Sequence, residues 1–119
     1  MRRYKSEVSF ERRLAEANLI IKKYPDRIPV ICEKNDYKNT ASENIELDKR
    51  KYLVPNNLTL GQFQFVVRKR MKLSPEKGLF FFINNVVPNA TAPISELYNL
   101  FHEDDNFLYI TYSSENVFG

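Results

Sequence analysis

The sequence predicts an α+β fold in which a four-stranded mixed sheet wraps around one helix and two further helices precede the sheet. Three observations support it. Strand-like and helix-like patterns alternate after about residue 25, the apolar runs are short, and no repeat or change of composition divides the 119 residues. At this length, roughly two thirds of the surface of the unfolded chain can be buried, so one domain has a sufficient core.

The first helix-like pattern covers residues 10–24, where apolar residues recur at spacings of three and four. Ser9 is a suitable N-cap, Lys22 and Lys23 suit the negative end of the helix dipole, and Pro25 ends the pattern. A shorter amphipathic stretch comes before it at residues 3–8. We therefore expect residues 1–24 to form a helical extension that packs on the domain.

Residues 28–33 predict a strand that is apolar on both sides, so both of its faces should be covered by helices. The polar, aperiodic residues 35–46 predict an exposed loop. A short strand then runs from Lys49 to Pro55. The basic residues that lead into it are typical of an edge strand, which must avoid pairing with stray chains.

Thr59 and Gln62 predict a capping box at the start of a helix that runs to about residue 70. Five consecutive apolar residues at 79–83 predict a buried strand.

Pro93 predicts the start of a last helix, and residues 107–112 predict a last strand. The order of elements is that of the β-grasp fold. Its core should cover residues 25–112, and the patternless residues 113–119 should form a flexible tail.

Charge is distributed unevenly along the chain. All 18 basic residues and 10 of the 15 acidic residues lie in residues 1–94, and residues 95–119 carry the other five acidic residues and no basic one. A basic body attracts acidic partners and anionic membrane surfaces. The excess is nevertheless mild beside that of a dedicated nucleic-acid-binding protein, so we expect no nucleic acid partner.

Several chemical classes are disfavoured. One Cys and one His provide neither a disulfide nor a structural zinc site, and no apolar run approaches the roughly 20 residues that span a bilayer. No nucleophile elbow, P-loop or dinucleotide motif occurs. We expect a soluble cytoplasmic protein that is not an enzyme and has no catalytic residue, metal or cofactor.

Individual reactive residues have ordinary explanations. Cys32 lies within an apolar strand, where a small buried hydrophobic residue is expected and not a nucleophile. His102 and the acidic residues at 103–105 predict a charged helix end in solvent. The basic cluster at 68–72 is either a solvated helix end or a patch that contacts a protein, and the three Phe residues at 80–82 belong to a core strand.

Six blocks of sequence resemble the autophagy ubiquitin-like modifiers of the GABARAP and light-chain family. The match extends in one register over residues 10–119. The blocks are residues 22–34 (KKYPDRIPVICEK), 47–55 (LDKRKYLVP), 61–63 (GQF), 79–85 (LFFFINN), 107–113 (FLYITYS) and the final Phe-Gly.

This resemblance implies a ubiquitin-like β-grasp fold with two additional N-terminal helices. It also implies that Gly119 is joined to phosphatidylethanolamine on autophagic membranes, after Phe118 and the rest of the tail are presented to E1-like and E2-like enzymes. A deconjugating cysteine protease and cargo receptors with short linear motifs are further implied partners. By the same resemblance, we expect a monomer that is cytoplasmic, or autophagosomal after lipidation.

The resemblance also implies two peptide-binding pockets for an aromatic and an aliphatic anchor. Pocket 1 would be lined by Glu16, Ile20, Pro29, Lys51, Leu53 and Phe107. Pocket 2 would be lined by Tyr52, Val54, Pro55, Leu58, Phe63 and Val66. A basic rim around them would consist of Arg27, Lys49, Arg50, Arg68 and Arg70.

Two departures from the family limit what the resemblance implies. The loop at 35–46 looks a few residues longer than in close relatives, and the chain stops at Gly119, where many relatives carry residues that a protease removes. Two alternatives stay open. The chain could be a ubiquitin-like adaptor that is not conjugated, or a basic module that binds tubulin or nucleic acid with a steep dependence on salt.

Overall fold

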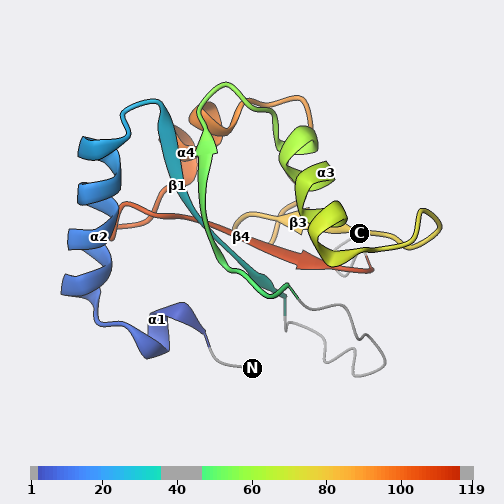
Figure 1. The fold of residues 1–119 in the computed structure, drawn as a ribbon, viewed down its shortest axis with the longest axis horizontal. Helices are drawn as coiled ribbons and strands as arrows, with labels where there is room; N and C mark the ends of the chain where they lie inside the picture. Colours follow the sequence, from blue (N-terminus) through green and yellow to red (C-terminus); the bar gives the residue numbers. More distant parts are fainter. Residues whose placement is uncertain (1–2, 36–46, 116–119) are drawn as a thin grey trace.

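The computed structural model describes residues 3–35 and 47–115 (Figure 1). Phe118, Gly119 and all of the predicted loop at 35–46 except Asn35 lie outside these residues. Asn35 is not exposed as expected but 8% exposed, because its backbone N–H donates to the carbonyl of Tyr112 at 2.7 Å and so continues the pairing of β1 with β4. The elements in chain order are α1 (Tyr4–Glu7), α2 (Phe10–Lys23), β1 (Arg27–Lys34), β2 (Lys51–Pro55), α3 (Leu60–Met71), β3 (Phe80–Phe82), α4 (Ile94–Phe101) and β4 (Leu108–Ser113).

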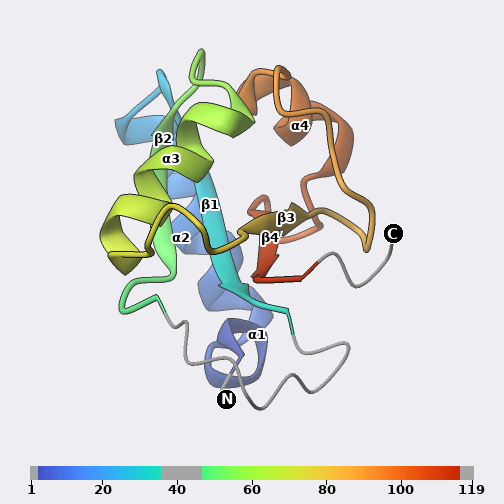
Figure 2. The ribbon, with the colours of Figure 1, turned by 90° about the vertical axis from the view of Figure 1, so that its right-hand side faces the viewer.

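The four strands form one mixed sheet in the order β2-β1-β4-β3. The central strands β1 and β4 are parallel, and β2 and β3 each pair antiparallel with one of them. Among the described residues, β2 and β3 are therefore the two edges of the sheet. The α3 helix crosses one face of the sheet, and the views in Figures 1 and 2 place α1 and α2 on the other face.

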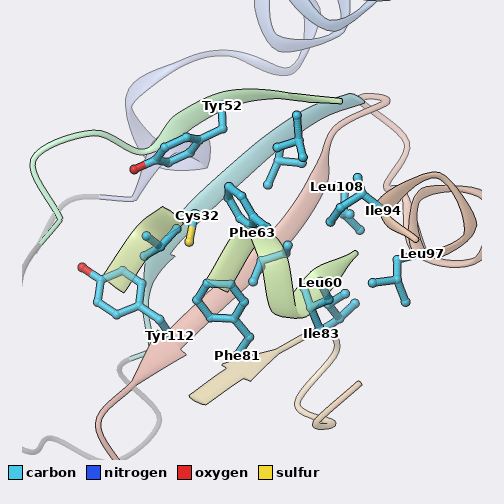
Figure 3. Close-up of a cluster of buried hydrophobic side chains, with 14 of the residues drawn as sticks. Cys32, Tyr52, Leu60, Phe63, Phe81, Ile83, Ile94, Leu97, Leu108 and Tyr112 are labelled. Carbon is cyan, nitrogen blue, oxygen red and sulfur yellow. The ribbon is translucent and has the colours of Figure 1, made fainter. Parts of the chain in front are cut away.

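Alternation along β1 divides the core into two clusters. Val30 and Cys32 belong to the larger cluster, which packs α3 and α4 against the sheet (Figure 3). Ile31 belongs to a smaller cluster under α1 and α2, with Tyr4 and Phe107. Each of these five residues is 3% exposed or less, so the expectation that helices cover both faces of this strand is confirmed.

The helix ends follow the local sequence. The Ser9 hydroxyl accepts a hydrogen bond from the backbone N–H of Arg12 at 3.3 Å, which caps α2. The predicted capping box is also present, because Thr59 and Gln62 exchange hydrogen bonds at the start of α3. Both caps use only residues within three positions, which is why the sequence predicts them.

The last strand extends one residue beyond the boundary that we expected for the tail. Ser113 pairs with Phe80 in the antiparallel register of β3 and β4 and is only 5% exposed. Since β3 extends to Phe80, its partner strand continues to Ser113. A strand end set by a neighbouring strand has no signal in its own sequence.

Cys32 is buried as predicted, at 1% exposure, and burial raises the pKa of its thiol above the ordinary value. We expect an alkylating reagent to modify the native protein at least about a hundredfold more slowly than the unfolded protein, because the core must open first. Mass spectrometry of samples with and without denaturant measures both rates. Equal rates would contradict the burial, and Cys32→Val should change the free energy of unfolding by less than about 1.5 kcal/mol.

Candidate functional site

The open edge of β2 presents backbone groups to an incoming strand. The N–H of Cys32 donates to the carbonyl of Arg50 at 2.7 Å, and these residues continue the register in which Ile31 faces Lys51. Because hydrogen-bonded residues alternate along an antiparallel pair, the backbone groups of Lys51 and Leu53 point away from β1. The guanidinium of Arg27 reaches this edge and donates to the Leu53 carbonyl at 3.2 Å.

Side chains of β2 alternate between the two core clusters, as the strand pattern predicts. Tyr52 and Val54 are buried and pack in the larger cluster with α3. Leu53 is partly exposed and packs against the smaller cluster beneath α2. The edge therefore has an apolar surface on each side, separated by the thickness of one strand.

The residues expected at pocket 1 are brought together between α2 and β2. Ile20, Leu53 and Phe107 share the smaller cluster, and Pro29 faces Leu53 across the strand pair. An ion pair between Glu16 and Lys51 completes the set.

Glu16 also links this pocket to α1, because its other carboxylate oxygen accepts a hydrogen bond from the Tyr4 hydroxyl. Partial burial opposes ionisation of Glu16, but the hydrogen bonds from Lys51 and Tyr4 outweigh it and hold the pKa of the carboxyl below its ordinary value. Glu16 is therefore an anion at neutral pH. The Tyr4 ring packs edge-on against Phe107 with centroids 5.6 Å apart, which joins α1 to the floor of the pocket.

The residues expected at pocket 2 also lie together, but three of them are part of the core. Tyr52, Val54 and Phe63 are 7% exposed or less, and the Tyr52 and Phe63 rings meet edge-on with centroids 5.3 Å apart (Figure 3). The remaining three, which are Pro55, Leu58 and Val66, reach the surface, and Val66 is 47% exposed. An aliphatic anchor would therefore meet a shallow surface over this core.

Most of the expected basic rim is held by neighbouring groups. Arg50 pairs with Glu7, and Arg70 pairs with Asp48 at 2.8 Å. Lys49 lies over the Tyr52 ring, 4.9 Å from its centroid.

Arg68 donates to the carbonyls of Ser74 and Lys77 and so holds the turn after α3. Arg68 and Arg70 therefore make contacts within the protein, and the choice between a solvated helix end and a patch that contacts another protein stays open. The positive charge around β2 remains, but these contacts restrict the orientation of the Arg68 and Arg70 side chains.

One expectation about the acidic residues after α4 is wrong. Asp105 is not in solvent but 2% exposed, and it accepts hydrogen bonds from Arg13 Nε at 2.9 Å, from the backbone N–H of Phe107 at 3.0 Å and from the Tyr109 hydroxyl. Asn106 adopts a left-handed conformation with φ of 66°, so the chain reverses there. That reversal brings Asp105 beneath α2, which a linear charge pattern does not reveal.

The structure adds functional residues that the sequence pattern did not indicate. Tyr4 and Arg13 connect α1 and α2 to the sheet through the carboxylates that they contact, Tyr4 through Glu16 and Arg13 through Asp105. No group of three or more metal-ligating side chains lies together in the described part of the chain. Within the same residues, no helix is long and apolar enough to cross a membrane.

A mixed four-stranded sheet wrapped around α3, with an open edge at β2 and helices added at its N-terminus, defines a ubiquitin-like protein. The family model described as "Autophagy protein Atg8 ubiquitin like" matches residues 12–119. The chain belongs to this Atg8 family, and the resemblance seen in the sequence is confirmed.

Relatives and solved structures agree over nearly the whole length. The chain is 53% identical over 116 residues to autophagy-related protein 8 of Schizosaccharomyces pombe, covering 98% of this chain and 93% of the relative. It is 54% identical over 117 residues to the protein of the same name from Coccidioides immitis, covering 98% and 97%.

Two solved structures have the same fold. The crystal structure of Trypanosoma brucei ATG8 superimposes with a TM-score of 0.84 at 40% identity, covering 95% of this chain and 94% of that chain. Plasmodium falciparum Atg8, solved in complex with a Plasmodium falciparum Atg3 peptide, superimposes with a TM-score of 0.82 at 37% identity, covering 97% and 98%. The predicted ubiquitin-like fold class is thereby confirmed.

Proposed function

We propose that this chain is a ubiquitin-like modifier that is joined through Gly119 to phosphatidylethanolamine and acts in autophagosome formation. In this role it recruits receptors that carry aromatic-x-x-aliphatic motifs. The open edge of β2, lying between two apolar clusters, is the observation that carries the proposal. Membership of the Atg8 family supports the conjugation step, for which the sequence supplies Gly119 and the preceding Phe118.

Strand addition explains how one edge accepts many peptides. The outward backbone groups of Lys51 and Leu53 pair with any extended chain, and the side chains beside them select the anchors. An aromatic anchor would lie at pocket 1 near Leu53 and an aliphatic anchor over pocket 2 near Val66. Each anchor contributes about 1.5 to 3 kcal/mol, and after ordering costs the sum is compatible with micromolar binding, near −8 kcal/mol.

The proposed partners follow from conjugation and from the motif. They are an E1-like enzyme, an E2-like enzyme of the Atg3 type and a deconjugating cysteine protease. The solved Atg8 complex with an Atg3 peptide supports the second of these. The protein would act as a monomer that moves from the cytoplasm to autophagosomal membranes when it is lipidated, with no catalytic activity of its own.

Leu53→Ala should weaken binding of an acidic peptide with an aromatic-x-x-aliphatic motif by about tenfold, because it removes apolar contact at pocket 1. Isothermal titration with wild type and variant measures the loss. Leu53 is the better position for this test because Tyr52 is buried, so Tyr52→Ala would also damage the core. Raising the salt concentration should weaken the wild-type complex, since the edge is basic.

Phe65→Ala is a matched control, because Phe65 is 60% exposed on α3 and belongs to neither pocket. It should bind the peptide as the wild type does. Thermal melting of both variants separates a loss of contact from a loss of fold. Equal affinities of wild type and Leu53→Ala would overturn the proposed edge.

A further inference from the structure

The turn between α3 and β3 contains the sequence Ser74-Pro75-Glu76-Lys77. Of the six prolines of the chain, only Pro75 follows a serine or a threonine. Because a proline has no backbone N–H and a fixed φ, the hydroxyl before it suits an enzyme whose substrate site takes a proline at the next position. Lys77 adds a basic group three positions after the hydroxyl. This pattern is that of a substrate for a proline-directed kinase.

The turn lies at the surface, beyond the end of α3 (Figure 1). The N–H of Lys77 donates to the carbonyl of Ser74 at 3.0 Å, and Pro75 occupies the second position of the turn, where its fixed φ is favourable. Ser74 is partly exposed, and the three residues after it are exposed. An enzyme can therefore reach the hydroxyl by opening this turn and not the core.

Positive charge surrounds the turn. Residues 68–77 contain five basic residues and one acidic residue, Glu76. The Arg68 guanidinium already contacts the turn, because Nη1 donates to the carbonyl of Ser74 at 3.3 Å and to that of Lys77 at 2.8 Å. Arginine binds phosphate through paired, charge-assisted hydrogen bonds, so a phosphate on Ser74 would have a cation within reach.

The Ser74 hydroxyl bonds to an exposed carboxylate in the present turn. Hydrogen bonds from the backbone N–H of Glu76 and from the Ser74 hydroxyl hold the pKa of the Glu76 carboxyl below its ordinary value. A phosphoryl group on Ser74 would remove this donor and place a second anion beside the carboxylate. Repulsion by Glu76 would then favour an orientation of the phosphate toward Arg68.

The end of α3 also lies beside the open edge of the sheet. Arg70 pairs with Asp48, three residues before β2 begins, and both Arg68 and Arg70 belong to the basic rim expected around the two pockets. A phosphate adds a charge of about −1.5 to −2 at neutral pH. With this charge bound to Arg68, the rim would attract an acidic peptide less strongly.

We propose that Ser74 is a phosphorylation site of a proline-directed kinase, and that its phosphate, bound by Arg68, lowers the affinity of the β2 edge for acidic motif peptides. This inference rests on the proposed function of that edge. In the reaction, Ser74 Oγ attacks the γ-phosphorus of ATP, a new O–P bond forms, the bond from that phosphorus to the bridging oxygen breaks, and ADP leaves. The hydroxyl proton passes to a base of the kinase.

The first test measures the modification itself. Native wild-type protein is incubated with ATP, Mg²⁺ and a proline-directed kinase of the cyclin-dependent class. Mass spectrometry should locate a phosphoryl group on Ser74 and find none in Ser74→Ala. Absence of phosphate from Ser74, or its appearance only after the protein is denatured, would overturn the site.

The second test measures the contact with Arg68. The second pKa of a phosphoserine is about 6, and a neighbouring guanidinium favours the dianion. Phosphorus NMR should therefore give a lower pKa for the phosphorylated wild type than for phosphorylated Arg68→Gln. Lys69→Gln is the matched control, because it removes a cation that lies over the Phe65 ring, 5.1 Å from its centroid, and it should titrate close to the wild type. Equal pKa values in the wild type and Arg68→Gln would overturn the role of Arg68.

The third test measures peptide binding by fluorescence polarisation, with an acidic aromatic-x-x-aliphatic peptide and a second peptide in which amides replace the acidic side chains. At low salt, phosphorylation should weaken binding of the acidic peptide by about threefold to tenfold and that of the amide peptide by less than about twofold. The loss should decrease as the salt concentration rises. Unphosphorylated Ser74→Ala should bind both peptides as the wild type does. No loss, or an equal loss for both peptides, would overturn the regulation by charge.

The same titrations separate this inference from the proposed function. If Leu53→Ala weakens binding of the acidic peptide and phosphorylation does not, the regulation alone is overturned. If Leu53→Ala has no effect, the edge and its regulation are overturned together, and the first two tests still decide whether Ser74 is a phosphorylation site with Arg68 as its partner.

Discussion

Gly119→Ala is expected to abolish conjugation to phosphatidylethanolamine, with a fall in rate of about a hundredfold or more. The conjugate requires an amide bond between the carboxyl group of residue 119 and the amine of the lipid. With no side chain, a glycine carboxyl group can enter a narrow channel and meet a catalytic cysteine, whereas an added methyl group next to the reacting carbon displaces it. Incubation with E1-like and E2-like enzymes, ATP and liposomes containing the lipid measures the rate by gel mobility.

Two controls make the outcome specific. Gly119→Ala should melt at the wild-type temperature, because the residue lies beyond β4, which ends at Ser113. Glu115→Ala changes an exposed position of the same region and should be conjugated normally. Lipidation of Gly119→Ala at the wild-type rate would reject Gly119 as the reactive residue and favour the alternative of an adaptor that is not conjugated.

Arg13→Ala is expected to lower the free energy of unfolding by about 3 to 5 kcal/mol. Arg13 is 11% exposed and its partner Asp105 is 2% exposed, so the substitution leaves a buried carboxylate without its cation. Arg13 also donates to the carbonyl of Val8 at 2.6 Å, so the link between α1 and α2 is lost as well. Urea denaturation followed by circular dichroism measures the change.

Arg70→Ala is the matched control for this prediction. It removes an arginine from an ion pair of similar length, 2.8 Å to Asp48, in which the two side chains are 43% and 73% exposed. Water solvates both charges there, so the loss should be no more than about 1 kcal/mol. Equal losses in the two variants would show that the burial of Asp105 adds nothing to the stability of the fold.

Local sequence patterns determined the elements and the division of the sheet faces. The caps at Ser9 and Thr59 depend on residues three positions away, and the burial of Cys32 follows from alternation within one strand. The assignment of Lys49–Pro55 to an edge strand likewise needed only the basic residues that lead into the strand and the proline that ends it. The strand β2 itself begins at Lys51. These features are short in range, so one segment contains the information that predicts them.

Tertiary structure alone decided the features that join distant segments. Asp105 lies in an acidic run that resembles a solvated helix end, and its burial depends on Arg13, 92 residues away. Residues of pocket 1 meet because α2, β1, β2 and the segment just before β4 converge. A long-range contact pairs two groups, and the residues next to either group in the sequence do not indicate the other one. The sequence by itself therefore determined which residues are apolar or charged. Packing determined which of these residues are buried, paired or exposed.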